Sequence, residues 1–165
     1  MKRLAALLLG VAAMSGCGLR PLYAGGEAGP VAQVLRSVAV RPIAGQTGWL
    51  VRTALVDRLG EPQGAARFRL EVELDDDIEG YGIRGDAAVT RERRTLRARY
   101  RLVDITTGAV VLDATAGSDA GIDVVSSEYA TVAAEQTAVE RLSAIVADQI
   151  VSRLGLFAAR TEPRR

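Results

Sequence analysis

The chain has 165 residues, of which 21 are basic and 20 acidic, and it contains one cysteine and no histidine. The near-neutral charge argues against a nucleic-acid-binding protein, which would carry a marked basic excess. Without histidine, and with a single thiol, the chain lacks Ser-His and Cys-His nucleophilic pairs and the usual zinc and iron ligand sets. Only carboxylates and hydroxyls remain for chemistry, so we expect neither an enzyme nor a cofactor. The length suits one domain with its own core.

The N-terminus is typical of a bacterial export signal. Lys2 and Arg3 precede an apolar run of about ten residues, well short of the roughly twenty that span a bilayer as a helix. The only cysteine, Cys17, follows Met-Ser-Gly. This junction resembles a lipobox, in which cleavage precedes the cysteine and both its thiol and its new amine are acylated. We predict a signal peptide over 1–16 and lipidation at Cys17; the alternative is an ordinary cysteine near a conventional cleavage site.

The first half of the predicted domain contains one strand and one helix. The segment after Cys17 is rich in glycine and carries two prolines, which predicts a lipidated flexible tether over 17–33. The β-branched stretch VLRSVAVRPI (34–43) predicts the first strand. Thr47 is the expected N-cap of an amphipathic helix that ends at Gly60 and Pro62.

Two segments with strict alternation predict a β-hairpin. In RFRLEVELDDD (67–77) and in the stretch from Thr95 to Leu102, apolar and charged residues alternate along the chain. Cross-strand pairs of opposite charge stabilise such a hairpin by a few tenths to about 1 kcal/mol each. A turn near Gly85 sets one register, and a register displaced by two residues is the alternative. The first register pairs Glu73 with Arg97 and Glu71 with Arg99, and it places Arg69 against Arg101 as a like-charge clash.

The last elements are a strand and a long helix. The strand is predicted from Ala109 to about Ala116, followed by a glycine- and aspartate-containing loop. Ser126 or Ser127 is expected to cap a helix that ends at Leu154 before Gly155, with a disordered tail over 157–165. The predicted apolar stripe of this helix comprises Val132, Val139, Leu142, Val146, Ile150 and Leu154, with Ile145 and Val151 beside it.

These elements define the expected fold class. It is α+β, a two-layer sandwich of a roughly four-stranded, mostly antiparallel sheet with two helices packed on one face, in the order β-α-β-β-β-α. The domain is expected to span 34–156.

Candidate binding residues are confined to charged stretches. The acidic run from Leu74 to Gly80 lacks the ligand spacing of a calcium-binding loop. The glycines of 80–85 are not followed by the helix that a phosphate-binding loop needs. A solvated turn explains both stretches. The most basic stretch is TRERRTLRARYR (90–101). It is either an anion-binding site or a sheet face neutralised by neighbouring glutamates. The arginines with the fewest obvious partners, and hence the candidate phosphate contacts, are Arg84, Arg91, Arg93 and Arg94.

Several of these segments together resemble a known family. The string CGLRPLY (17–23), the element order, the turn VDITTG (103–108) and the long helix from Ser126 to Leu154 are similar to the alphaproteobacterial form of the LptE family. Members of that family are outer-membrane lipoproteins of lipopolysaccharide assembly and have no catalytic role. The resemblance covers nearly the whole chain after the signal.

The resemblance implies partners and a location. It implies a protein that binds and plugs an LptD-like outer-membrane β-barrel, supports its assembly, and aids delivery of lipopolysaccharide to the outer leaflet. It implies acyl chains on Cys17 that hold the protein on the periplasmic side of the outer membrane. It also implies lipopolysaccharide contacts by basic residues near one end of the sheet, which Arg84, Arg91, Arg93 and Arg94 would supply. The alternative from another class is an accessory lipoprotein of an ABC-type phospholipid or envelope transport system.

Overall fold

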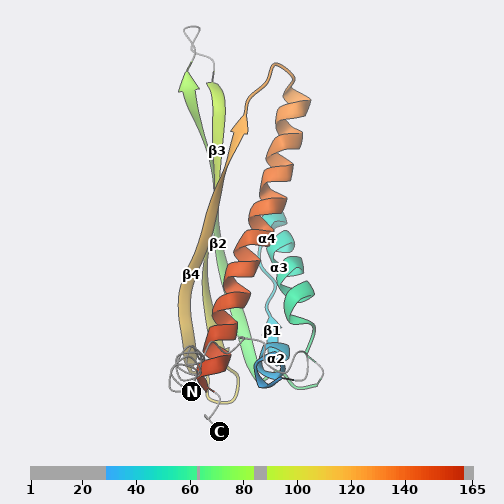
Figure 1. The fold of residues 1–165 in the computed structure, drawn as a ribbon, viewed down its shortest axis with the longest axis vertical. Helices are drawn as coiled ribbons and strands as arrows, with labels where there is room; N and C mark the ends of the chain where they lie inside the picture. The colour runs from blue at the N-terminus through green and yellow to red at the C-terminus, as the bar shows by residue number, and fades with distance from the viewer. Residues whose placement is uncertain (1–28, 63, 84–88, 162–165) are drawn as a thin grey trace, which may run out of the picture.

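The computed structural model describes residues 29–62, 64–83 and 89–161, and it is built from long strands and one long helix. Figure 1 shows an elongated molecule in which β2, β3, β4 and α4 follow the long axis, with α2 near one end. In chain order the elements are α2 (Pro30–Arg36), β1 (Val38–Val40), α3 (Gly45–Leu59), β2 (Phe68–Ile83), β3 (Val89–Asp104), β4 (Val110–Asp123) and α4 (Glu128–Thr161).

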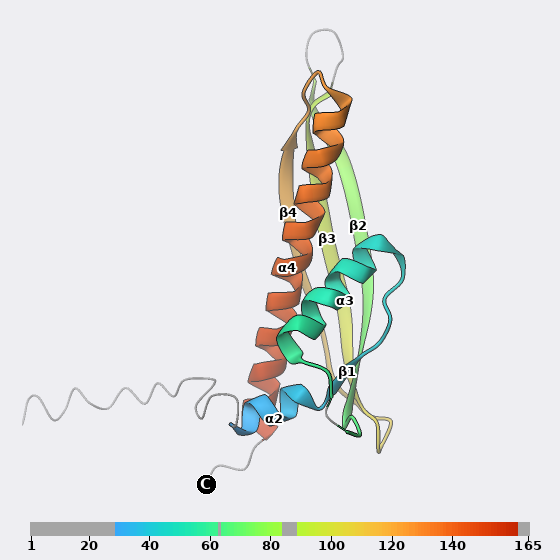
Figure 2. The ribbon, with the colours of Figure 1, turned by 90° about the vertical axis from the view of Figure 1, so that its right-hand side faces the viewer.

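The sheet has the order β1-β2-β3-β4, so neighbours in sequence are neighbours in space. Strand β1 pairs in parallel with β2, and the two longer pairs are antiparallel. Helices α3 and α4 lie on the same face of this sheet (Figure 2). The predicted two-layer α+β architecture is therefore confirmed, with α2 as an additional helix ahead of the predicted order.

The core is the seam between the helices and the inner face of the sheet. Because strand side chains alternate, the even-numbered residues of β2, β3 and β4 point toward the helices. On β3, Leu96 and Leu102 are completely or almost completely buried, and Phe68 of β2 packs edge-on against Phe157 of α4, with ring centroids 5.9 Å apart. The buried positions of α4 that match the predicted stripe are Val139, Leu142, Val146, Ile150, Val151 and Leu154.

Two members of the predicted stripe lie outside the core. Val132 is 55% exposed and Ile145 is 43% exposed. By length and composition alone α4 could cross a membrane, but half of its most apolar 18-residue stretch is buried within the fold. Its apolar face is explained by packing on the sheet.

The beginning of the domain differs from the prediction. Residues 30–36, expected to form the end of a tether and the start of a strand, form α2, with Pro30 in the first turn, where a missing N–H costs nothing. Val31 and Leu35 of α2 are buried. The first strand is shortened to Val38–Val40. Helix α3 begins at Gly45, and its N-cap Ala44 makes no side-chain hydrogen bond, so the predicted capping role of Thr47 is wrong.

The C-terminal elements are longer than predicted. Strand β4 continues to Asp123, because residues 117–123 pair with β3 instead of forming a loop. Ser127 caps the first turn of α4 as predicted, its Oγ accepting the N–H of Ala130 at 3.4 Å. Helix α4 passes through the buried Gly155 and ends at Thr161, since packing of Ala158 outweighs the low helix propensity of glycine. The disordered tail predicted from 157 is therefore contradicted up to Thr161.

The close packing of the α3 N-terminus against the preceding loop can be tested by substitution of Gly48. A Cβ added at the buried Gly48 would lie 2.7 Å from the Ile43 carbonyl oxygen. We expect Gly48→Ala to lower the free energy of unfolding by about 1 to 3 kcal/mol, although alanine has the higher helix propensity. The control is Gln46→Ala, an exposed position in the same turn, which should be neutral or slightly stabilising in urea unfolding. Equal stability of the two variants would contradict the close packing.

Candidate functional site

The face of the sheet opposite the helices, called here the outer face, carries charge in three columns. The odd-numbered residues of β2, β3 and β4 point to this face, as the alternation predicts. The β2 column is acidic, the β3 column is almost entirely arginine, and the β4 column contains three aspartates. The β2 column is Glu71, Glu73, Asp75, Asp77 and Glu79; the β3 arginines are Arg91, Arg93, Arg97, Arg99 and Arg101; the β4 acids are Asp113, Asp119 and Asp123.

The observed register differs from the first predicted one by two residues. Glu71 lies opposite Arg101, and Glu73 lies opposite Arg99. This register removes the predicted clash, because Arg69 faces Val103 and instead forms an ion pair with Glu71 at 2.8 Å. The observed register is the alternative that the sequence allows, displaced by two residues.

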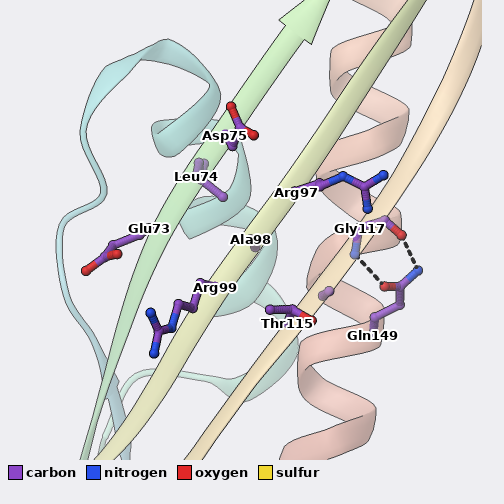
Figure 3. A pocket seen from close by; sticks show the side chains of 10 residues that line it. Glu73, Leu74, Asp75, Arg97, Ala98, Arg99, Thr115, Gly117 and Gln149 are labelled. Carbon is purple, nitrogen blue, oxygen red and sulfur yellow. Dashed lines mark hydrogen bonds between the residues drawn. The ribbon is translucent and has the colours of Figure 1, made fainter.

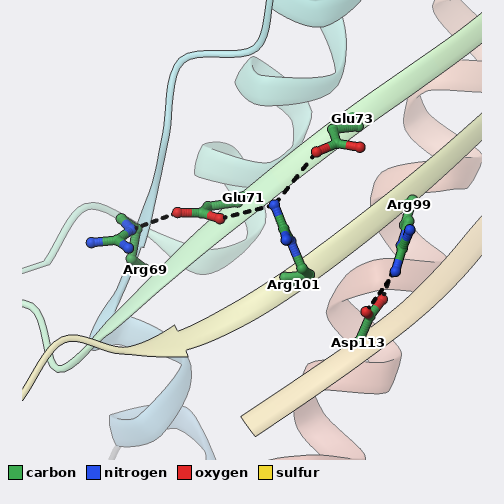
Figure 4. A network of polar contacts seen from close by, with 6 residues as sticks. All are labelled: Arg69, Glu71, Glu73, Arg99, Arg101 and Asp113. Atoms are coloured by element: carbon green, nitrogen blue, oxygen red, sulfur yellow. Dashed lines mark hydrogen bonds and ion pairs between the residues drawn. The ribbon is translucent and has the colours of Figure 1, made fainter. Parts of the chain in front are cut away.

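Ion pairs neutralise the arginine column at Arg99 and Arg101 (Figure 4). Arg101 lies 3.5 Å from a carboxylate oxygen of both Glu71 and Glu73. Arg99 donates two hydrogen bonds to Asp113, at 2.9 and 3.3 Å, and these bonds lower the pKa of the Asp113 carboxyl. The partners come from both flanking strands, so the arginine column joins two acidic columns. This part of the face is a neutralised sheet surface.

Arg97 differs from its neighbours. Among the described residues it has no carboxylate within ion-pair distance, although Asp75 lies opposite it in the register. Its side chain instead extends over Gly117 of β4, where a Cβ would lie 3.3 Å from the Arg97 Cγ (Figure 3). A shallow groove of about 520 Å³ surrounds it, lined among others by Glu73, Asp75, Arg97, Arg99, Thr115 and Gln149.

Gln149 of α4 forms the end of this groove. Its side-chain amide accepts the N–H of Gly117 at 3.0 Å and donates to the Gly117 carbonyl at 3.2 Å. The amide thus replaces a neighbouring strand at one position of the β4 edge (Figure 3). Because Gly117 has no side chain, Gln149 can hydrogen bond to its backbone and the Arg97 side chain can lie over it.

Near the tip of the β2–β3 hairpin, the outer face holds two predicted site residues. Arg93 lies over the ring of Tyr81, 5.4 Å from its centroid, and has no carboxylate partner in the described part of the chain. Arg91 forms an ion pair with Asp123 at 3.2 Å, but both side chains are largely exposed. An exposed pair of this kind contributes little, so Arg91 can exchange Asp123 for another anion at small cost.

Arg94 lies on the inner face, as its even position predicts, and serves the fold. Its guanidinium donates two hydrogen bonds to Asp76, at 2.6 and 2.8 Å, and a third to the carbonyl of Glu135 in α4 at 3.3 Å. Thr47 of α3 also donates to Asp76, at 2.7 Å. These bonds, with the Arg94 bond as the largest cause, lower the pKa of the Asp76 carboxyl. The cluster joins β2, β3, α3 and α4.

The predicted site residues therefore separate into different environments. The structure brings Arg91 and Arg93 together on the outer face and places Arg94 on the opposite one, while Arg84 and Cys17 lie outside the described residues. Arg91 and Arg94 were expected to have few partners, but Asp123 and Asp76 bind them. The sequence missed Arg97, and the only signal was Gly117, whose position opposite Arg97 depends on the β3–β4 register.

The chemistry available on this surface is recognition of anions. Guanidinium groups bind phosphate or carboxylate oxygens through paired hydrogen bonds. Within residues 29–62, 64–83 and 89–161, no group of three or more acidic or cysteine side chains is arranged to hold a metal ion. The arginines without a carboxylate partner, Arg93 and Arg97, are the best-placed candidates.

The Arg94–Asp76 pair predicts a pH-dependent stability. We expect Asp76→Asn to lower the free energy of unfolding at pH 7 by roughly 1 to 3 kcal/mol, because charge-assisted hydrogen bonds are lost from side chains that are only 14% and 20% exposed. The folded-state pKa of Asp76 lies below its unfolded value. Its contribution is therefore complete above the unfolded pKa and is lost as the pH falls through the folded pKa.

Urea unfolding of both proteins from pH 7 down to pH 3 measures this difference, which should shrink below about pH 4. The control is Asp75→Asn, which removes an exposed carboxylate that has no ion-pair partner among the described residues. A difference for Asp76→Asn that stays constant over this range would contradict the assigned role of the pair.

Comparisons with known proteins complete the description. A family model described as LptE, Lipopolysaccharide-assembly, matches residues 35–154. No curated protein sequence matches the chain. Among solved structures, a candidate lipoprotein from Caulobacter crescentus CB15 is similar with 28% identity and a TM-score of 0.66, over 82% of this chain and 100% of that one.

Two more distant structures share the fold. Rare lipoprotein B from Shewanella oneidensis has a TM-score of 0.60 at 11% identity, over 76% of this chain and 98% of that chain. Lipoprotein B from Nitrosomonas europaea has a TM-score of 0.56 at 10% identity, over 78% of this chain and 88% of that chain. At these identities the likeness shows the fold alone.

Proposed function

The chain belongs to the LptE family of lipopolysaccharide-assembly proteins, and we propose that it is a lipid-anchored subunit that occupies and plugs an LptD-like outer-membrane β-barrel. The match of the family model over residues 35–154 carries this proposal. In this role the protein supports assembly of the barrel and the delivery of lipopolysaccharide to the outer leaflet, and it performs no catalysis.

The anchor and the charged surface agree with this role. The lipobox-like sequence before Cys17 supports acylation of that residue and retention on the periplasmic side of the outer membrane. The lumen of a large outer-membrane barrel is polar, so a plug needs a charged exterior over its own apolar core. The outer face supplies such an exterior, with positive and negative columns side by side.

Recovery of the barrel from cell envelopes tests the proposal. Affinity purification of the tagged, full-length protein from detergent-solubilised envelopes should recover a large β-barrel protein in near-stoichiometric amount. Cys17→Ala should leave an unprocessed or soluble precursor and reduce this recovery. Recovery of an inner-membrane permease instead of a barrel would replace the proposal with the phospholipid-transport alternative.

The arginines provide the proposed lipopolysaccharide contacts. Arg93 and Arg97 have no carboxylate partner in the described part of the chain, and Arg91 has a weak, exposed one. Arg84 stays a candidate from the sequence alone. Arg94 is the weakest of the original candidates, because phosphate binding there would break the pair with Asp76.

We expect Arg93→Gln combined with Arg97→Gln to weaken lipopolysaccharide binding in vitro by about tenfold or more, since each charge-assisted hydrogen bond contributes roughly 1.5 to 3 kcal/mol. The matched control, Arg99→Gln with Arg101→Gln, changes the net charge equally but removes arginines that carboxylates already bind. A larger loss in the control than in the Arg93 and Arg97 variant would show that the overall field, and not these contacts, governs binding.

A further inference from the structure

We propose that the outer edge of β2, from Val72 to Gly80, binds an extended, basic segment of the barrel subunit as an additional strand of the sheet. This inference rests on the proposed function for the identity of the partner. It adds the place of contact, the backbone geometry and the charge that the partner segment must carry.

The first observation is that β1 covers only the beginning of β2. The β1–β2 pairing ends at Val40 and Leu70, after which the Leu70 carbonyl accepts the N–H of Arg41 at 3.0 Å. Strand β2 continues to Ile83. Among the described residues, none makes a backbone hydrogen bond to this edge of β2 beyond Leu70.

The alternation of the strand identifies the free backbone groups. Since the carbonyl of Leu70 points to the β1 side and the β2–β3 register is regular as far as Tyr81, the even-numbered residues direct N–H and C=O to the same edge. These residues are Val72, Leu74, Asp76, Ile78 and Gly80. The edge they form is roughly 25 to 30 Å long at the usual rise of about 3.3 Å per residue, which suffices for a full strand.

At the opposite edge of the sheet, a side chain already occupies backbone groups of β4. At β4 the side chain of Gln149 hydrogen bonds to both backbone groups of Gly117, and α4 packs along this strand. This side chain blocks the middle of the β4 edge, because an added strand would need the same backbone groups of Gly117. On the β2 edge beyond Leu70, no described residue occupies the backbone groups in this way.

Charge defines the occupant. Along this edge the outer face carries Asp75, Asp77 and Glu79, all exposed and without an ion-pair partner in the described part of the chain. A second copy of this chain would oppose acid to acid in a β2–β2 pair, and the β4 strand would bring Asp113, Asp119 and Asp123. Like charges directly opposite each other destabilise a strand pair, so the occupant carries lysine or arginine.

The test replaces one edge-facing N–H. Ile78 is 41% exposed and its backbone points to the free edge, so Ile78→Pro removes a donor without breaking a β2–β3 hydrogen bond. We expect the full-length variant to recover at least tenfold less barrel protein from solubilised envelopes than the wild type. The matched control is Ile78→Ala, which removes the same side chain but retains the N–H and should recover nearly wild-type amounts.

A second variant keeps the test decisive if Ile78→Pro does not fold, as judged by circular dichroism. Asp77→Lys with Glu79→Lys leaves the backbone intact and should reduce recovery through charge repulsion. Asp119→Lys, at an exposed position of β4 on the other side of the sheet, should not. If Ile78→Pro folds and recovers wild-type amounts of barrel protein, the strand-addition proposal alone is overturned. If Ile78→Pro does not fold, wild-type recovery of barrel protein by the lysine variant has the same consequence. A wild-type protein that recovers no barrel overturns the proposed function and this inference with it.

Discussion

The apolar seam between α4 and the three long strands is the contact on which the rest of the structure depends. Helix α4 buries Leu142, Val146, Ile150 and Leu154 against inner-face residues such as Leu96 and Leu102. Because strand side chains alternate, burial of the inner face fixes which residues point outward. The three charged columns of the outer face are thus a direct consequence of the core. A displacement by a single residue would exchange the two faces.

The same alternation explains how far the sequence predicted the fold. Long periodic segments, such as 67–77 and the helix capped by Ser127, correctly predicted the sheet. They also predicted the two main helices and their packing on one face of that sheet. The short α2 was missed, because Val31 and Leu35 gain helical structure only by packing in the core. Glycine in a sequence predicts a break at 117 and at 155, but pairing with β3 maintains the strand at Gly117 and burial maintains the helix at Gly155.

The candidate site was less accessible to prediction than the fold. The odd position of Arg91 and the even position of Arg94 place the two residues on different faces, but sequence spacing could not show that Asp123 and Asp76 lie beside them. Those contacts depend on the β3–β4 register and on the β2–β3 register, which differed by two residues from the first choice. Arg97 has no ion-pair partner in the described part of the chain for the same reason, since its neighbour on β4 is Gly117 and not an acid.

The arrangement of charge, more than its total, distinguishes this surface. Arginines occupy β3, where carboxylates from both sides can reach them, and the acids occupy the flanking strands β2 and β4. Among the described residues, positive charge without a carboxylate partner therefore lies in the middle of the face, at Arg93 and Arg97, and negative charge without an ion-pair partner lies beside the β2 edge. Under the two proposals above, lipopolysaccharide and a basic segment of the barrel contact adjacent columns of the same face, because Arg93 lies opposite Glu79 and Arg97 lies opposite Asp75. A nearly neutral chain with no histidine and almost no lysine can in this way carry two recognition surfaces of opposite sign.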